Sequence, residues 1–169
     1  MPFELRRAES ADIPYLMATE RGPGFATFVA RSESDEHAGF LASPQCAVFI
    51  GMRDGAPIGF AILRDIEDRN GNVYLKRIAV AAPDHGEGTA LLNALGDWIF
   101  AFAASHRFWL DCFEDNLRAQ RAYTKIGISV DGRLREAYRL PDGQRKTLVM
   151  MAVTRPEWEA RREISRRSS

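Results

Sequence analysis

Residues 80–92 read V-A-A-P-D-H-G-E-G-T-A-L-L and join an apolar, strand-like run to a long amphipathic segment. Pro83, Gly86 and Gly88 do not favour continuation of the strand, and a glycine, which has no Cβ, lets a ligand approach the main chain closely. The first N–H groups of the following helix have no intrahelical partner and lie at the positive end of its dipole. This order of strand, glycine-rich turn and helix predicts a phosphate-binding site at residues 86–90.

Two well-known phosphate loops do not match this turn. No glycine in the chain is followed directly by Lys-Ser or Lys-Thr, as a P-loop requires, and Leu91 stands where a dinucleotide-binding fingerprint has its third glycine. A glycine-rich turn before a helix is also a common tight connection without any ligand. A second motif is therefore needed before the turn can be assigned a function.

The second motif lies in residues 110–132, L-D-C-F-E-D-N-L-R-A-Q-R-A-Y-T-K-I-G-I-S-V-D-G. Asn116 begins a short helix, Ala119 and Tyr123 follow it by three and seven residues, and Gly127 ends the helix. These offsets place the three side chains on one helix face, where the small Ala119 leaves room for a ligand between Asn116 and the phenol. The same residues also fit a helix N-cap and a core aromatic with a solvated hydroxyl.

Together the two motifs resemble the GNAT superfamily of acetyl-CoA-dependent N-acetyltransferases, over about residues 76–135. The turn resembles the family's Gln/Arg-x-x-Gly-x-Gly/Ala loop, with Gly88 and Ala90 at its last two positions. It departs from that pattern at His85, which replaces Gln or Arg, and at Glu87, which brings a negative charge beside the expected pyrophosphate. Main-chain N–H groups should still hold the phosphate, and His85 can donate a hydrogen bond.

The resemblance implies direct transfer of an acetyl group from acetyl-CoA, bound as co-substrate, to a primary amine, without a metal. The amine would belong to a protein N-terminus, a polyamine or a small molecule. The main chain of Ile78 and Val80 would pair with the amide-rich pantetheine arm. The residues that we expect to bind the cofactor are Ile78, Val80, His85, Gly86, Glu87, Gly88, Thr89, Ala90 and Asn116.

The resemblance also places Tyr123 against the sulfur, so its phenol is the candidate acid that protonates the leaving thiolate. Asp111, a lone carboxylate in an apolar run, is the candidate base for the amine, or else a structural acid paired with an arginine. Glu114 and Asp115 are further candidate bases. The competing hypothesis is a non-catalytic, acyl-CoA-binding regulatory domain, which has no chemical need for Tyr123. A hydrolase is not supported, because the chain has no G-x-S-x-G elbow.

The remaining pattern predicts an α/β (α+β), GNAT-like single domain with a mixed, mostly antiparallel sheet of six to seven strands and helices on both faces. Asp54-Gly55 and Asn70-Gly71 are typical of two-residue hairpin turns and predict three consecutive antiparallel strands. A strand that follows a crossover helix lies parallel to the strand before it, so residues 73–80 should pair with residues 108–113. The resemblance implies that this parallel pair is splayed.

Besides the short helix that begins at Asn116, three helical regions are predicted around these strands. Ser10 is the expected N-cap of the first helix, and residues 25–42 form a second, less regular helical region. The acidic patch of this second region (Glu33, Asp35 and Glu36) either faces the substrate or belongs to a solvated helix pair. Apolar residues at helical spacing after residue 90 predict a third, buried helix that ends near His106.

Composition limits the function classes. The chain of 169 residues fits one domain, 1–155, followed by a short, charged and frayed helical tail, 156–169. Acidic and basic residues balance at 23 each, so we expect no nucleic-acid or membrane partner, and a homodimer stays open. Cys46 and Cys112 lie in apolar runs without metal-ligand spacing, so we expect buried, reduced thiols in the cytoplasm.

Overall fold

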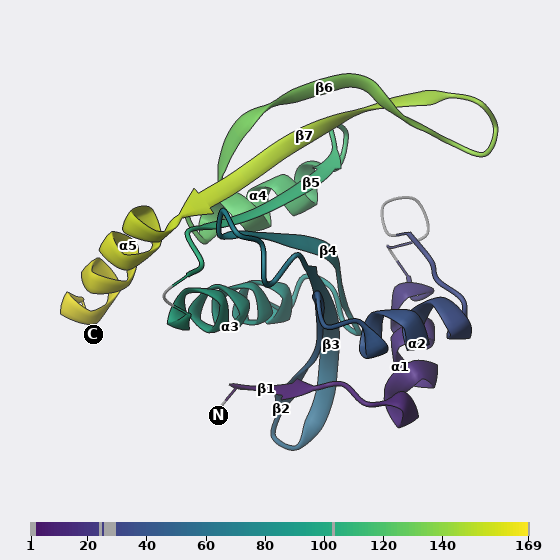
Figure 1. The fold of residues 1–169 in the computed structure, drawn as a ribbon, viewed down its shortest axis with the longest axis horizontal. Helices are drawn as coiled ribbons and strands as arrows, with labels where there is room; N and C mark the ends of the chain where they lie inside the picture. The colour runs from purple at the N-terminus through teal and green to yellow at the C-terminus, as the bar shows by residue number, and fades with distance from the viewer. Residues whose placement is uncertain (1–2, 24, 26–29, 103, 169) are drawn as a thin grey trace.

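The computed structural model describes residues 3–23, 25, 30–102 and 104–168, which fold around one seven-stranded sheet (Figure 1). Its strands are β1 (Phe3–Arg7), β2 (Cys46–Arg53), β3 (Ala56–Arg64), β4 (Asn72–Val80), β5 (Arg107–Phe113), β6 (Ser129–Arg139) and β7 (Arg145–Thr154). They lie in the order β1-β2-β3-β4-β5-β7-β6, and β4 with β5 is the parallel pair in an otherwise antiparallel sheet. The prediction of a mixed, mostly antiparallel sheet is confirmed.

Helices cover both faces of this sheet. In Figure 1, α3 lies on one side of β3, and α1 and α2 lie on the other side. The helices in the described part of the chain are the short 3-10 helix η1 (Ser10–Asp12), α1 (Ile13–Glu20), α2 (Ser34–Ala42), α3 (Glu87–Ala101), α4 (Leu117–Lys125) and α5 (Arg155–Arg167). None of them is both long and apolar enough to span a membrane.

The parallel pair separates toward its carboxyl end. Residues 72–74 of β4 pair with residues 107–109 of β5, and the register between these strands goes no further. β4 continues to pair with β3 as far as Val80, while β5 continues to pair with β7 as far as Phe113. The predicted splay is therefore present, and it leaves one edge of β4 without a strand partner next to the turn that leads into α3.

One of the two predicted hairpin turns is correct. Asp54 and Gly55 connect β2 to β3 with φ angles of 52° and 78°, the left-handed values that such a turn requires. The two-residue turn at Asn70-Gly71 is wrong, because β3 ends at Arg64 and β4 begins at Asn72. The Asp68 carboxylate accepts hydrogen bonds from the main-chain N–H groups of Asn70 and Asn72, and so closes a longer loop.

The N-terminal helical region differs from the prediction in two places. Ser10 is not an N-cap: Glu9 caps η1 through a reciprocal capping box with Asp12. The second helix begins only at Ser34, so the described residues between 25 and 33 are not helical. Residues 26–29 of the predicted helical region lie outside the described residues.

The C-terminal segment forms the helix α5, as expected of a helical tail, and the start of this helix is packed against the domain and not frayed. Trp158 of α5 is only 2% exposed and packs in the core, and its Nε1 donates to Asp97 Oδ1 at 3.0 Å. The Arg155 guanidinium donates to the carbonyls of Phe100, Phe102 and Ser105. These bonds satisfy the carbonyl of Phe100 in the last turn of α3 and those of Phe102 and Ser105 beyond it, which is consistent with a helix that ends at Ala101 and not near His106.

Candidate active site

A cavity of about 750 Å³ lies at the splay of the parallel pair. β4 and β5 contribute one wall, the start of α3 another, and the inner face of α4 a third. Tyr138, Leu140 and Pro141 reach the cavity from the β6–β7 hairpin, and Ala30 and Arg31 from the segment before α2. Segments far apart in the sequence therefore enclose one space, at the place where the two sequence motifs meet.

The turn between β4 and α3 is built as an anion-binding cradle. Gly86 is the N-cap of α3 with φ 81°, a left-handed angle that suits glycine, and its carbonyl accepts the first intrahelical bond from Ala90 N at 3.1 Å. The N–H groups of residues 87–89 precede that bond and have no intrahelical acceptor. A Cβ on Gly88 would meet no atom closer than Val80 Cγ1 at 4.0 Å, so the main chain here is open on the cavity side.

Six of the nine residues predicted to bind the cofactor line the cavity: Ile78, Val80, Gly86, Gly88, Thr89 and Asn116. His85, Glu87 and Ala90 do not line it, and His85 is exposed. Arg53 holds the Glu87 carboxylate by two contacts from Nε, at 2.9 and 3.0 Å, and one from Nη2, at 2.8 Å. The negative charge of Glu87 is thus compensated from β2, which weakens the objection that it repels a phosphate.

The second motif occupies one face of α4. Asn116 is the N-cap of this helix, and its Oδ1 accepts a hydrogen bond from Ala119 N at 3.2 Å while the residue also lines the cavity. Tyr123 lies about two turns further along the same face, with its ring in the core cluster and 8% of its surface exposed. These residues therefore cap the helix and pack in the core, and they also face the cavity, where a ligand could lie.

Burial keeps the Tyr123 phenol protonated. Its pKa is raised above the ordinary value first by burial and then by the neighbouring Cys112, Asp111 and Tyr74. Burial, followed by the charge of Asp111, also raises the pKa of the Cys112 thiol to about 11. The cavity therefore presents a neutral phenol and a neutral thiol at physiological pH, and the phenol is the better hydrogen-bond donor of the two.

Asp111 faces the same cavity from β5. Tyr74 Oη donates to Asp111 Oδ2 at 2.9 Å, and the Tyr74 ring stacks on Trp109 with centroids 4.3 Å apart. No ion pair to an arginine is found for Asp111 in the described part of the chain, so its alternative role as half of such a pair has no support. Burial and then Asp111 raise the pKa of Tyr74, which keeps this phenol a donor.

The two fallback bases have other partners. Glu114 forms an ion pair with Arg133, and Asp115 forms one with Lys146. Neither residue lines the cavity, whereas Asp111 does. The geometry therefore favours Asp111 among the three carboxylates that the sequence offered.

Sequence reasoning missed a β-bulge in β4. Leu75 pairs with Leu63 and Arg77 pairs with Ile62, so Lys76 is an extra residue without a partner in β3. Lys76 and Arg77 both line the cavity as a result, together with Tyr74. A bulge leaves no reliable signal in a single sequence, but Tyr74 could have been found from its alternation with the predicted site residue Ile78 along β4.

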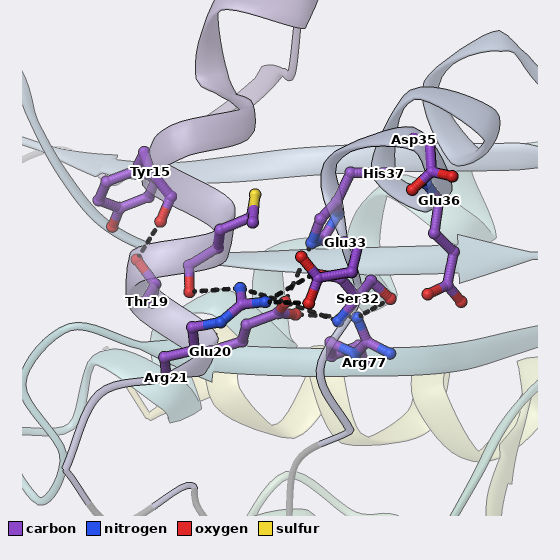
Figure 2. Close-up of polar contacts among 11 residues, drawn as sticks. Tyr15, Thr19, Glu20, Arg21, Ser32, Glu33, Asp35, Glu36, His37 and Arg77 are labelled. Carbon is purple, nitrogen blue, oxygen red and sulfur yellow. Dashed lines mark hydrogen bonds and ion pairs between the residues drawn. The ribbon is translucent and has the colours of Figure 1, made fainter.

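Next to the cavity, at Arg77, lies a buried polar cluster that the sequence did not indicate, formed by Glu20, Ser32, His37 and Arg77 (Figure 2). Arg77 Nη1 donates to Glu20 Oε2 and to Ser32 Oγ, both at 2.8 Å. Glu20 Oε1 also accepts from Ser32 N at 2.8 Å and lies 3.1 Å from His37 Nε2. Glu20 is fully buried, so this cluster ties α1 and α2 to the bulged part of β4.

No metal centre is seen among the described residues, where no three His, Cys, Asp or Glu side chains are placed to share an ion. The cavity instead combines an anion cradle, an open strand edge, a protonated phenol and a carboxylate. A phosphate-bearing thioester fits the first two features, because the cradle suits pyrophosphate and an open strand edge pairs with amides. The last two features can give a proton to one group and take a proton from another.

Comparison with known proteins places this site in a family. The acetyltransferase (GNAT) family profile matches residues 15–128 of the chain. Uncharacterised N-acetyltransferases of Mycobacterium tuberculosis and Mycobacterium bovis are 35% identical to it over 114 residues, which cover 63% of this chain and 69% of theirs. The sequence relationship and the predicted resemblance therefore agree.

Solved structures share the fold. The spermidine N-acetyltransferase of Vibrio cholerae, in complex with CoA and spermine, has a TM-score of 0.79 at 18% identity, covering 92% of this chain and 97% of that one. The ribosomal-protein-S18-alanine N-acetyltransferase of Escherichia coli has a TM-score of 0.72 at 22% identity, covering 90% and 94%. The chain belongs to the GNAT family of acetyltransferases.

Proposed function

We propose that the protein transfers an acetyl group from acetyl-CoA directly to a primary amine of a protein N-terminus, a polyamine or a small molecule. The observation that carries this proposal is the single cavity at the β4–β5 splay, which brings both sequence motifs together. Enzymes of the GNAT family use acetyl-CoA, and the cavity has the features that such a co-substrate requires.

The cradle and the strand edge supply the proposed binding contacts. The free N–H groups of residues 87–89 would hold the pyrophosphate at the N-terminus of α3, and Gly88 would let it approach. The open edge of β4 at Ile78 and Val80 would pair with the pantetheine amides, and Asn116 would border the same arm from α4. His85, Glu87 and Ala90 would shape the turn without touching the ligand through their side chains.

Tyr123 and Asp111 have complementary roles in the proposed reaction. An ammonium group must lose a proton before it attacks, and Asp111, held by the Tyr74 hydroxyl, would accept that proton directly or through water. The Tyr123 phenol would donate its proton to the departing sulfur. Acetyl-CoA supplies the activated acetyl group, and the chain itself orients the amine and moves the two protons.

The binding half of the proposal can be tested with a matched pair of glycine substitutions. Gly88→Val adds side-chain atoms where we expect the pyrophosphate, and it should weaken acetyl-CoA binding at least about tenfold by calorimetry. Gly39→Val, in α2 and away from the cavity, also meets no atom within 4 Å of its Cβ and is the control. Equal affinity of the two folded variants would rule out the cradle.

The catalytic half requires an assay of thiol release against peptides, polyamines and other small amines. Release of CoA that depends on an amine supports acetyl transfer. Acetyl-CoA binding without release for any acceptor would instead support the alternative, a non-catalytic regulatory domain.

We also place the protein in the cytoplasm, because Cys46 and Cys112 are both free and buried, as is usual in a reducing compartment.

A further inference from the structure

The end of the cavity that we assign to the acceptor contains charges of both signs. Asp111 lies on β5, and Lys76 and Arg77 lie opposite on the bulged part of β4, with Arg31 at the edge. Lys76 and Asp111 line the same space, and no ion pair joins them among the described residues. A molecule between them would meet a carboxylate on one side and cations on the other.

The charge of Lys76 is poorly compensated. Its ammonium lies 5.4 Å from the centroid of the Phe40 ring, and the side chain is half-buried. Burial, and then Arg77 and Arg64, lower the pKa of Lys76, while Glu36 and Asp111 act in the opposite direction. Glu36 is exposed on α2 and does not line the cavity. An anion inside the cavity would therefore stabilise the positive charge of the Lys76 ammonium.

The buried polar cluster holds the Arg77 side chain in place. Figure 2 shows Glu20 and Ser32 meeting its guanidinium, and both bonds come from Nη1. Arg77 Nε is buried without a hydrogen-bond partner. The buried cluster therefore fixes a guanidinium beside Lys76 and leaves part of its donor capacity unused.

Acidic side chains are scarce in the cavity. Asp84 and Asp111 are the acids that line it, and Asp84 lies 3.8 Å from Arg118 at the cofactor end. The predicted acidic patch of Glu33, Asp35 and Glu36 does not line the cavity, and Glu33 instead bonds Arg21 at 2.9 Å. A polyamine, whose charges are all positive, would find one carboxylate here and several cations.

We propose that the acceptor is a primary amine that also carries a carboxylate or a similar anionic group, with its ammonium directed to Asp111 and its anion to Lys76. This inference rests on the proposed acetyl transfer and narrows its substrate class. Two sources share this chemistry, a free amino acid and a peptide whose N-terminal residue is followed by an acidic residue. Tyr138, Leu140 and Pro141 add an apolar wall beside the charges, which suits an acceptor with a hydrophobic part.

Pairs of acceptors that differ only in one anionic group measure the contribution of that group to acetylation. Phenylalanine is compared with phenylalaninamide, and peptides beginning Ala-Asp are compared with peptides beginning Ala-Asn, with spermidine as the polycation. Because a hydrogen bond to a charged group is worth more than one to a neutral group, we expect kcat/KM for the acidic member of at least one pair to be about ten- to a hundredfold higher. Amidation makes the amine of phenylalanine less basic and so favours the amide, which makes the first comparison a stringent one.

Substitution of Lys76 tests the contact itself. Lys76→Gln should raise KM for the anionic acceptor about tenfold or more, and so reduce the preference for this acceptor over its neutral partner by a similar factor. Arg64→Gln is the matched control, since Arg64 also acts on Lys76 through space but does not line the cavity. Lys76→Glu should reverse the preference in favour of the neutral or cationic acceptor.

The outcomes separate this inference from the proposed function. Faster turnover of spermidine than of every anionic acceptor, or an unchanged preference in Lys76→Gln, would overturn the inference while acetyl transfer stands. Binding of the same pairs to the protein saturated with CoA is measured by calorimetry alongside. If no anionic acceptor binds more tightly than its neutral partner and none is acetylated, the inference is wrong, whatever the affinity for acetyl-CoA.

Discussion

Tyr123 packs in the hydrophobic core and also lines the cavity. The change Tyr123→Phe keeps the ring and removes only the donor. If the phenol protonates the leaving thiolate, kcat should fall by roughly ten- to a thousandfold, and acetyl-CoA affinity should change little. A thiol such as that of CoA has a pKa near about 8.5, so the residual rate should be measurable.

The control for this substitution is Tyr15→Phe. Tyr15 Oη is buried without a hydrogen-bond partner, and Tyr15 does not line the cavity. Loss of its hydroxyl should leave the acetylation rate within about twofold of wild type, since nothing catalytic depends on it. Wild-type turnover by Tyr123→Phe would make water the better candidate for the proton donor.

Motif spacing in the sequence predicted residues that line the cavity, but it did not predict which side chain neutralises the charge of Glu87. The motif spacing located Gly86, Gly88, Asn116 and Tyr123, because spacing along one loop or one helix is a local property. The doubt about Glu87 could not be resolved in the same way. Its partner Arg53 lies on β2, and only the folded sheet brings the two together.

The buried cluster is a property of elements, since Glu20 on α1 joins Arg77 on β4 to Ser32 and His37 near α2. Removing one member of a buried ion pair leaves an uncompensated charge, so Glu20→Gln should lower the free energy of unfolding by about 3–5 kcal/mol. Chemical denaturation followed by fluorescence measures this change.

Glu33→Gln is the matched control for Glu20→Gln. Glu33 also bonds an arginine, but 79% of its side chain is exposed, and exposed pairs contribute about 0–1 kcal/mol. Equal destabilisation by the two substitutions would mean that the cluster does not hold α1 and α2 to the sheet. In that case Arg77 would also lose its proposed role as a fixed cation.

Element-level predictions succeeded where the signal was local. The turn at Asp54-Gly55 formed as expected, because two left-handed residues define it completely. The end of α3 depends on long-range bonds from Arg155, which have no short-range signature. The loop before β4 is closed by local bonds from Asp68 to the N–H groups of Asn70 and Asn72, a signal that the assignment of Asn70-Gly71 to a hairpin turn did not use.

At the scale of the molecule, the sheet was predictable from connection rules. Hairpins give antiparallel neighbours, and the α3 crossover gives one parallel pair, so most of the strand order follows from element order alone. The insertion of β7 between β5 and β6 does not follow from those rules. That insertion also places the β6–β7 hairpin beside the cavity, where Tyr138 and Leu140 line it.

Residues 1–155 are expected from the sequence to form a complete unit. The packing of α5 argues against it: Trp158 lies so close to Gly96 that a Cβ there would come within 2.4 Å of the indole. Burying a tryptophan side chain contributes about 3–5 kcal/mol, as large-to-small substitutions show. Deletion of residues 156–169, or Trp158→Ala alone, should therefore lower the melting temperature by about 6–20 °C.

Ile164→Ala on the same helix is the control for the loss of α5 packing. Ile164 is 67% exposed, so this substitution should change the free energy of unfolding by no more than about 0.5 kcal/mol. Arg155 precedes Trp158 by three residues and binds carbonyls in the last turn of α3 and just after it, and the N-terminus of this helix forms the anion cradle. We therefore expect added acetyl-CoA to raise the melting temperature of the truncated chain less than that of the full chain. An unchanged melting temperature after truncation would instead restore residues 1–155 as an independent unit.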